Sequence, residues 1–173
     1  MKTMALTVAL VGTILVAGAA VANADVNDAW ITTKTKIALL TTDGFSVNGV
    51  NVDTIHGNVT MHGKVATTED RTRAERTVRK VKGVKTVTNL LQVVPSNVKE
   101  VVAASDADVK TRVEASLSTD TKMKNVNVAS VNNGVVLLSG KTDNLSEKLR
   151  AIENAYSVIG VRRVASEIQT IED

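Results

Sequence analysis

The sequence contains no cysteine and only one residue each of proline, tryptophan, tyrosine and phenylalanine among its 173 residues. The absence of cysteine excludes disulfide bonds, thiolate metal sites, a cysteine nucleophile and the lipid-modified cysteine of a lipoprotein. Aromatic residues make up only 2% of the chain, so any core must be built from aliphatic side chains. The single proline and the mixed charges are atypical of a disordered or low-complexity chain.

The N-terminus has the pattern of a signal peptide. Lys2 provides a short positive start, residues 4–21 are small and almost wholly apolar, and Ala22-Asn23-Ala24 fits an A-x-A cleavage site. An uncleaved membrane anchor is the alternative, because about 18 apolar residues approach the length that spans a bilayer. We expect export to the periplasm with cleavage after Ala24, and no lipoprotein anchor.

The rest of the chain is a tandem repeat. Two glycine-bounded apolar segments, residues 57–63 and 134–140, lie 77 positions apart. The glycines at Gly83 and Gly160 keep the same step. A fixed step across separate motifs indicates a duplicated unit.

Each repeat predicts the same order of elements. Apolar residues at every fourth position predict a first helix, with Asp28 and Asp106 as the expected N-caps of the two copies. Thr35 is the one polar member of this stripe, where its counterpart is Val113. Alternating β-branched residues then predict a hairpin, followed by a second helix and a last strand. The predicted fold class is α+β, with two tandem α-β-β-α-β units, each a three-stranded sheet covered on one face by two helices.

The domain boundaries follow from the repeat. We predict a signal peptide at residues 1–24, a first domain at 28–94, a linker at 95–105 and a second domain at 106–171. A proline opens the linker and ends the preceding strand. Units of roughly 65 residues are near the lower size limit for independent folding, so packing of the two units together would help.

The order of motifs resembles the BON domain family. The shared pattern is D-x-x-[IV]-x7-L, a hairpin with G-x-V-x-[LM]-x-G, a helix and V-x-G-V-x-x-V, over Asp28 to Val94 and Asp106 to Ile171. With two copies behind a signal peptide, the resemblance implies a non-enzymatic periplasmic protein of the osmotically inducible kind. It also implies a link to osmotic and envelope stress and association with phospholipid surfaces or envelope proteins. It supplies no catalytic residues, metal ligands or cofactor.

The residue inventory argues against an enzyme or a metal site. The only histidines are His56 and His62, and the second repeat has asparagine and serine in their places. With a two-residue turn after His56, His56 pairs with Val59 and His62 with Asp53, which places the imidazoles on opposite faces of the sheet. A pair of Asp53 and His62 would still lack a serine nucleophile supported by the sequence. We therefore expect surface or turn histidines, and no catalytic residue, metal or cofactor.

The two repeats differ most in their second helices. In the second repeat the apolar positions form a continuous helical stripe of Leu145, Leu149, Ile152, Tyr156 and Ile159. The corresponding positions of the first repeat are all polar, so the stripe lies beyond the core that both units share. The alternatives are packing against the first unit, contact with another copy, a lipid or protein partner, or a rotated helix.

The second helix of the first repeat is basic instead. Its cations include Arg73, Arg76 and Lys80, and Glu75 is the one acidic residue between positions 71 and 85. Near an anionic membrane each such cation contributes about 1 kcal/mol, whereas a solvated surface helix is the alternative. We predict that this basic face and the apolar stripe bind an anionic phospholipid surface. A chaperone-like interaction with envelope proteins is the second hypothesis. Nucleic acid is a poor partner for an exported chain with few stacking aromatics.

Overall fold

The computed structural model describes residues 19–171, which form two units with the predicted order of elements. Most of the predicted signal peptide, residues 1–18, lies outside the described residues. The first unit comprises α1 (Ala19–Leu40), β1 (Val50–Ile55), β2 (Asn58–Val65), α2 (Thr68–Arg79), β3 (Thr86–Asn89) and β4 (Gln92–Val93). The second unit follows the 3-10 turn η1 (Ser96–Val98) and comprises α3 (Lys99–Ser118), the 3-10 turn η2 (Thr121–Met123), β5 (Val126–Asn132), β6 (Val135–Thr142), α4 (Leu145–Tyr156) and β7 (Arg163–Thr170).

Both sheets have the second strand of the hairpin at their centre. In the first unit β1 pairs antiparallel with β2, and β3 and β4 pair parallel with its other side. In the second unit β5 pairs antiparallel with β6, and β7 pairs parallel with it. The helix between the second and last strands makes the parallel pairing reachable. The predicted α+β class and repeat are confirmed.

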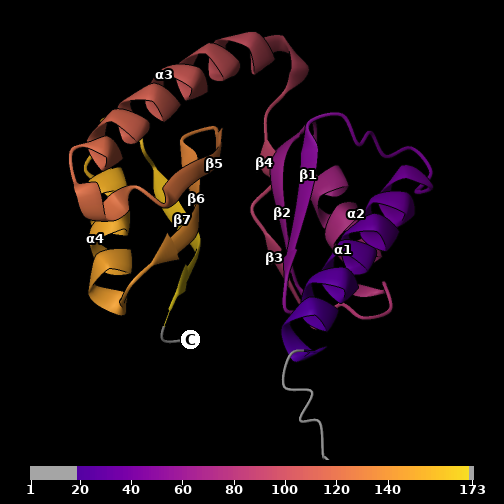
Figure 1. Cartoon of the computed structure of the whole chain (residues 1–173). Helices are drawn as coiled ribbons and strands as arrows, with labels where there is room; N and C mark the ends of the chain where they lie inside the picture. Colours follow the sequence, from indigo (N-terminus) through magenta and orange to yellow (C-terminus); the bar gives the residue numbers. More distant parts are fainter. Residues whose placement is uncertain (1–18, 172–173) are drawn as a thin grey trace, which may run out of the picture.

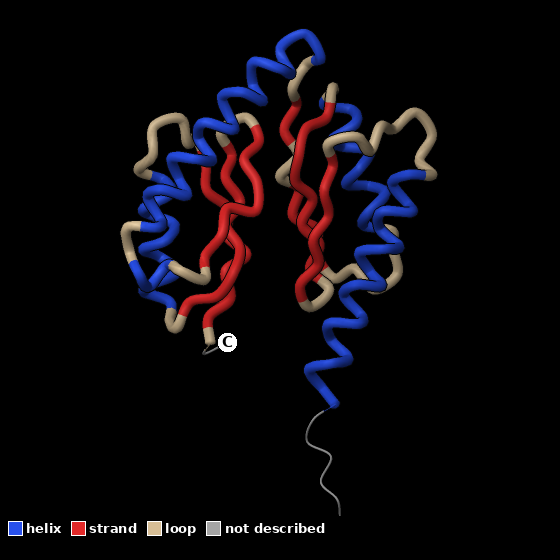
Figure 2. Tube along the Cα trace, turned by 45° about the horizontal axis from the view of Figure 1, so that its top comes forward, coloured by secondary structure: helices blue, strands red, loops and turns tan. Residues whose placement is uncertain are grey.

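The two units stack as four layers. Figure 1 shows α1 and α2 on the outer face of the first sheet, and α3 and α4 on the outer face of the second. Figure 2 shows the two sheets facing each other between these helices. Each unit has its own core between helices and sheet, centred on residues such as Ile31 and Met61 in the first and Val113 and Leu138 in the second. The sheet faces that the helices leave uncovered therefore meet one another.

The predicted N-cap roles of Asp28 and Asp106 are wrong. The helices α1 and α3 begin earlier, at Ala19 and Lys99, so both aspartates lie within helices. The carboxylate of Asp28 instead accepts hydrogen bonds from the backbone N–H groups of the first hairpin turn, at 2.6 and 2.8 Å. Asp106 does the same at the second hairpin turn, at 2.8 and 2.9 Å. In both units the aspartate therefore ties the first helix to the hairpin turn.

Much of the predicted linker is helical. Pro95 is followed by η1, and α3 already begins at Lys99. Residues 99–105 include lysine, glutamate and alanine, which favour a helix and extend α3 toward the first unit. The connection between the units is therefore only a few residues long.

The predicted hairpin register is wrong by a small shift. His56 and Gly57 themselves form the two-residue turn, with φ angles of 52° and 82°. A turn of this kind needs left-handed backbone at both positions, and the carboxylate of Asp28 holds their N–H groups. His62 consequently lies opposite Asn51, and not opposite Asp53 as predicted.

A polar side chain caps the second helix of each unit. Thr67 and Asn144 cap α2 and α4, and each side chain accepts a hydrogen bond from a backbone N–H in the first turn, at 3.0 Å. One difference appears in the last strand of the first unit, which is split into β3 and β4. The side chain of Asn89 accepts from the Leu91 N–H at 3.1 Å and interrupts the ladder.

Candidate functional site

The apolar stripe predicted on α4 faces solvent. The exposed fractions are 59% for Leu145, 57% for Leu149, 62% for Tyr156 and 82% for Ile159. Ile152 is the exception, because it is half-buried and packs against the core of the second unit. The first unit does not cover this face.

Small residues explain how α4 presents the stripe. Ala151 and Ala155 are fully buried against the sheet, so the helix axis lies close to the strands. The residue after each alanine is turned by about 100° around the helix axis. Larger side chains at such positions point away from the contact between the helix and the sheet. Packing of α4 thus uses alanine and the half-buried Ile152, and its leucines and tyrosine remain outside.

The basic residues predicted on α2 have unequal surroundings. Arg73 is half-buried and donates to the Glu69 carboxylate and to the Asp43 carbonyl oxygen, both at 2.9 Å. Arg76 and Lys80 are exposed, and within residues 19–171 no carboxylate lies within salt-bridge distance of either. Two of the three predicted cations are therefore free to meet an anion.

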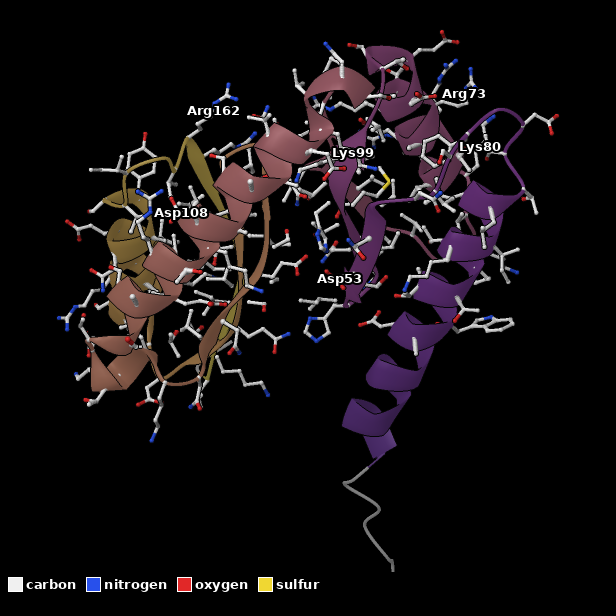
Figure 3. The ribbon with its side chains drawn as sticks, turned by 90° about the horizontal axis from the view of Figure 1, so that it is seen from above. Asp53, Arg73, Lys80, Lys99, Asp108 and Arg162 are labelled. Carbon is white, nitrogen blue, oxygen red and sulfur yellow. The ribbon has the colours of Figure 1, made fainter. Side chains whose placement is uncertain are left out.

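The structure does not bring the basic face and the apolar stripe together. α2 lies on the outer side of the first sheet and α4 on the outer side of the second, with both sheets between them (Figure 1). Figure 3 shows Arg73 and Lys80 on the side of the first unit that points away from the second. A single flat surface cannot contact both helix faces at once, so the predicted joint surface is not formed.

Other cations lie close to the apolar stripe in the sequence. Lys148 is on α4 itself, and Arg162 and Arg163 follow the glycine that ends the helix region. Arg150 is engaged with the Asp120 carboxylate at 3.2 Å. Over the part of the chain that is described, no helix is long and apolar enough to cross a membrane.

An ion pair joins the two units. The Lys64 ammonium, near the end of β2, lies 2.7 Å from the Asp106 carboxylate of α3, and the side chains are only 15% and 6% exposed. The corresponding residues at the opposite end of the molecule are Lys141 and Asp28. These two form no salt bridge in the described structure. This type of salt bridge therefore joins the two units at one end of the molecule only.

A polar cluster lies between the sheets. His62 is buried, and its Nε2 lies 2.9 Å from the Asp53 carboxylate, a hydrogen bond that lowers the pKa of Asp53. Glu167, on β7 of the other unit, faces this pair and hydrogen-bonds with the Thr60 hydroxyl. Burial raises the pKa of Glu167, and the negative charge of Asp53 raises it further, against the opposing hydrogen bond from Thr60 and the attraction of His62.

Beside this cluster the sheets enclose an open cavity of about 660 Å³. A second cavity, of about 290 Å³, is lined by His62 and shares Lys36 and Asp53 with the first. The larger cavity is lined by polar groups from both units, chiefly Asp28, Lys36, Asp53, His56, Ser139, Glu167 and Gln169. Among the described residues no group of three or more histidine or acidic side chains is arranged to hold a metal ion.

The Asp53 and His62 pair does not extend into a catalytic triad. Within residues 19–171 the other ring nitrogen, His62 Nδ1, is buried and has no hydrogen-bond partner. A triad needs a nucleophile at that nitrogen.

Sequence reasoning considered the pair of Asp53 and His62 but missed its meeting with Glu167 between the units. The signal available was the alternation along β2, which turns Thr60 and His62 away from the core residues Val59 and Met61. Alternation alone does not say what the second face meets. The cluster forms only because β7 brings Glu167 from a distant part of the chain.

Comparisons with known proteins agree with the repeat. The sequence profile described as BON domain matches residues 27–95 and 105–172. The chain is similar to Osmotically-inducible protein Y of Escherichia coli (strain K12), with 32% identity over 149 residues that cover 83% of this chain and 73% of that protein.

Solved structures of CdsD, a structural protein of the type III secretion system of Chlamydia trachomatis, align much more weakly. One structure, of the C-terminal domain, has a TM-score of 0.34 at 15% identity. Its alignment covers 83% of this chain and 67% of the CdsD chain. Another has a TM-score of 0.33 at 12% identity and covers 79% and 90%. Scores this low carry no argument about architecture or function.

Proposed function

Because the chain belongs to the BON domain family and carries two copies of the domain, we propose that it is an exported, non-enzymatic protein of osmotic and envelope stress that binds an anionic phospholipid surface. The similarity to a protein named for osmotic induction supports the stress role. The signal-peptide pattern that ends at Ala24 supports a periplasmic location.

The exposed stripe of α4 is the observation that carries the lipid proposal. Three large apolar side chains stand out from α4 and a fourth, Ile159, from the turn that follows it, and burying each fully is worth roughly 1.5–3 kcal/mol. Such a contiguous apolar face on a monomer marks an interaction surface. An amphipathic helix with cations beside its apolar face is typical of one that lies in the lipid headgroup region. Lys148, Arg162 and Arg163 supply those cations.

We propose that the binding surface is confined to α4 and the turn after it, and the separation of α2 from α4 supports this. Screening at physiological salt limits electrostatic attraction to about 8 Å, and both sheets separate the cations of α2 from the stripe. We therefore assign contact to Leu145, Leu149, Tyr156 and Ile159. We do not assign Arg73, Arg76 and Lys80 to this contact surface, in contrast to the prediction from the sequence.

Flotation with vesicles tests this assignment. The chain without its predicted signal peptide should bind vesicles that contain phosphatidylglycerol at low salt, and bind phosphatidylcholine vesicles much more weakly. Leu149→Asp combined with Tyr156→Asp should weaken binding at least about tenfold, because two contacts are replaced by charges that the membrane repels. The matched control, Leu40→Asp with Val101→Asp, places the same charges at exposed apolar positions of α1 and α3 and should bind nearly as well as the parent.

Two outcomes would contradict the assignment. Unchanged binding of the α4 variant would remove the stripe from the contact. A comparable loss in Arg76→Glu with Lys80→Glu would show that α2 takes part in the same contact.

A chaperone-like role for envelope proteins is the second candidate. It is favoured by the exposure of the apolar stripe, since such a face also suits the exposed apolar segments of an unfolded protein. Suppression of aggregation of an unfolded outer-membrane protein in lipid-free buffer, lost in the α4 variant, would support this role. Vesicle binding without such suppression would favour lipid.

A further inference from the structure

The cavity between the sheets has the dimensions and composition of a ligand site. Its volume of about 660 Å³ falls within the range of small-molecule pockets, and both units contribute hydrogen-bonding groups to it. Figure 3 shows Asp53 on the side of the first unit that faces the second. A ligand held here would contact α1 and β1 on one side and β6 and β7 on the other.

The charge of this cavity is opposite to that of the protein. The whole chain carries a formal net charge of +3. The residues that line the cavity include three carboxylates, from Asp28, Asp53 and Glu167, whereas Lys36 is the one lysine or arginine among them. The carboxylate of Asp28 is occupied by the hairpin turn, and one oxygen of Asp53 is hydrogen-bonded with His62, which leaves Glu167 and the other oxygen of Asp53 to face the cavity.

Glu167 lacks a cationic partner. Within the described chain no lysine, arginine or histidine nitrogen lies within 4 Å of its carboxylate, and its hydrogen bond with Thr60 is to a neutral hydroxyl. The carboxylate is half-buried and close to Asp53, and both conditions raise its pKa. A cation placed between the two carboxylates would relieve the repulsion and favour the ionised form.

His62 gives an independent indication of a missing hydrogen-bond partner. Its side chain is only 7% exposed, and it lines the smaller cavity that shares Lys36 and Asp53 with the larger one. Nε2 is hydrogen-bonded with Asp53, and no atom within residues 19–171 is a partner of the buried Nδ1. A buried polar atom without a partner is costly, so this region leaves a hydrogen-bonding group unsatisfied.

We propose that this cleft binds a small organic cation with a primary ammonium group, placed between Asp53 and Glu167. An ammonium group offers three donors, which match the two carboxylates and the Ser139 hydroxyl or the Gln169 amide oxygen. A quaternary ammonium ion fits less well, because no tryptophan, tyrosine or phenylalanine lines the cavity. A metal ion fits less well because the described residues form no group of three or more suitable ligands.

Putrescine is a suitable probe, with 1,4-butanediol as its uncharged counterpart of equal length. In a titration followed by NMR at low salt, putrescine should bind saturably and shift the resonances of His62 and of residues around Glu167. The diol should produce no such shifts, and magnesium chloride at equal ionic strength should not displace putrescine. Absence of saturable binding, or equal competition by magnesium, would overturn the proposal, because the carboxylates would then attract only diffuse counter-ions.

A conservative variant tests the residue assignment. Glu167→Gln keeps the shape and the hydrogen bond with Thr60 but removes the charge, and it should weaken putrescine binding at least tenfold while the protein stays folded. The matched control is Glu153→Gln, which removes an exposed carboxylate from α4 and should leave affinity unchanged. Equal affinity of the Glu167 variant and the parent would contradict the proposed site.

Discussion

Thr35 occupies in α1 the position that Val113 occupies in α3. Both side chains are fully buried, but the hydroxyl of Thr35 has no hydrogen-bond partner among the described residues. A buried hydroxyl without a partner costs about 1–3 kcal/mol. We therefore expect Thr35→Val to raise the free energy of unfolding by about 1–2 kcal/mol, as measured by urea denaturation.

The control for this change is Thr33→Val. Thr33 is exposed, and its hydroxyl donates to the Ala29 carbonyl oxygen at 2.9 Å, so its replacement should alter stability little. A loss of stability in Thr35→Val would mean that its hydroxyl is hydrogen-bonded in solution, for instance to a buried water molecule.

Glu167 makes stability depend on pH. Burial and then the charge of Asp53 raise its pKa above the ordinary value of 4.5 in the folded state. A raised pKa means that the favourable contribution is complete below pH 4.5 and is lost as the pH rises through the folded-state pKa. Glu167→Gln should therefore match the parent below pH 4.5 and become the more stable protein at neutral pH.

Urea denaturation across this pH range checks the direction. The exposed carboxylate variant Glu153→Gln supplies the baseline for losing an acidic side chain. If the advantage of Glu167→Gln shrinks toward neutral pH, the assignment of an unfavourable charge between the sheets is incorrect. The same variant is expected to bind putrescine poorly. A gain in its stability would show that the loss of affinity is not caused by unfolding.

Among the elements, those with strong local signals could be predicted from sequence. The caps at Thr67 and Asn144 and the glycine-bounded hairpins have short-range causes, which the chain displays within a few residues. Asp28 and Asp106 were misread because an aspartate before an apolar periodic run has the same appearance whether it caps a helix or lies inside one. Its true role depends on a hairpin turn nearly thirty residues away.

The contrast between α2 and α4 was also predictable in part. Because the repeats share a fold, polar residues at the stripe positions of α2 indicated that the stripe of α4 lies outside the common core, and its exposure agrees. Where the two helices lie relative to each other was not predictable. That arrangement depends on the inner sheet faces, where residues such as Thr60 and Glu167 give no periodic signal of a partner.

The ion pair of Lys64 and Asp106 is one of the contacts between the two units of the whole molecule, together with the inner sheet faces. Removing one partner of a buried pair costs about 3–5 kcal/mol, but the Asp106 carboxylate retains two backbone hydrogen bonds in this protein. We therefore expect Lys64→Met to lower the free energy of unfolding by about 2 kcal/mol. It should also enlarge the radius of gyration seen by small-angle X-ray scattering, because the end joined by this ion pair opens.

The duplicated chain provides the control. Lys141 is the exposed counterpart of Lys64, and no carboxylate of the described chain lies within salt-bridge distance of it. Lys141→Met should change stability by less than about 0.5 kcal/mol and leave the scattering profile unaltered. Equal effects of the two variants would show that the ion pair does not hold the units together.

The short connection from Val94 to Lys99 has a further consequence for association. A connection of only a few residues keeps one sheet at an effective concentration on the order of millimolar or above around the other. Even a weak polar interface is then populated, and the pairing does not depend on how much protein the cell makes. The two units resemble a dimer that does not dissociate on dilution. Cleavage between Pro95 and Val98 would make their association depend on the protein concentration.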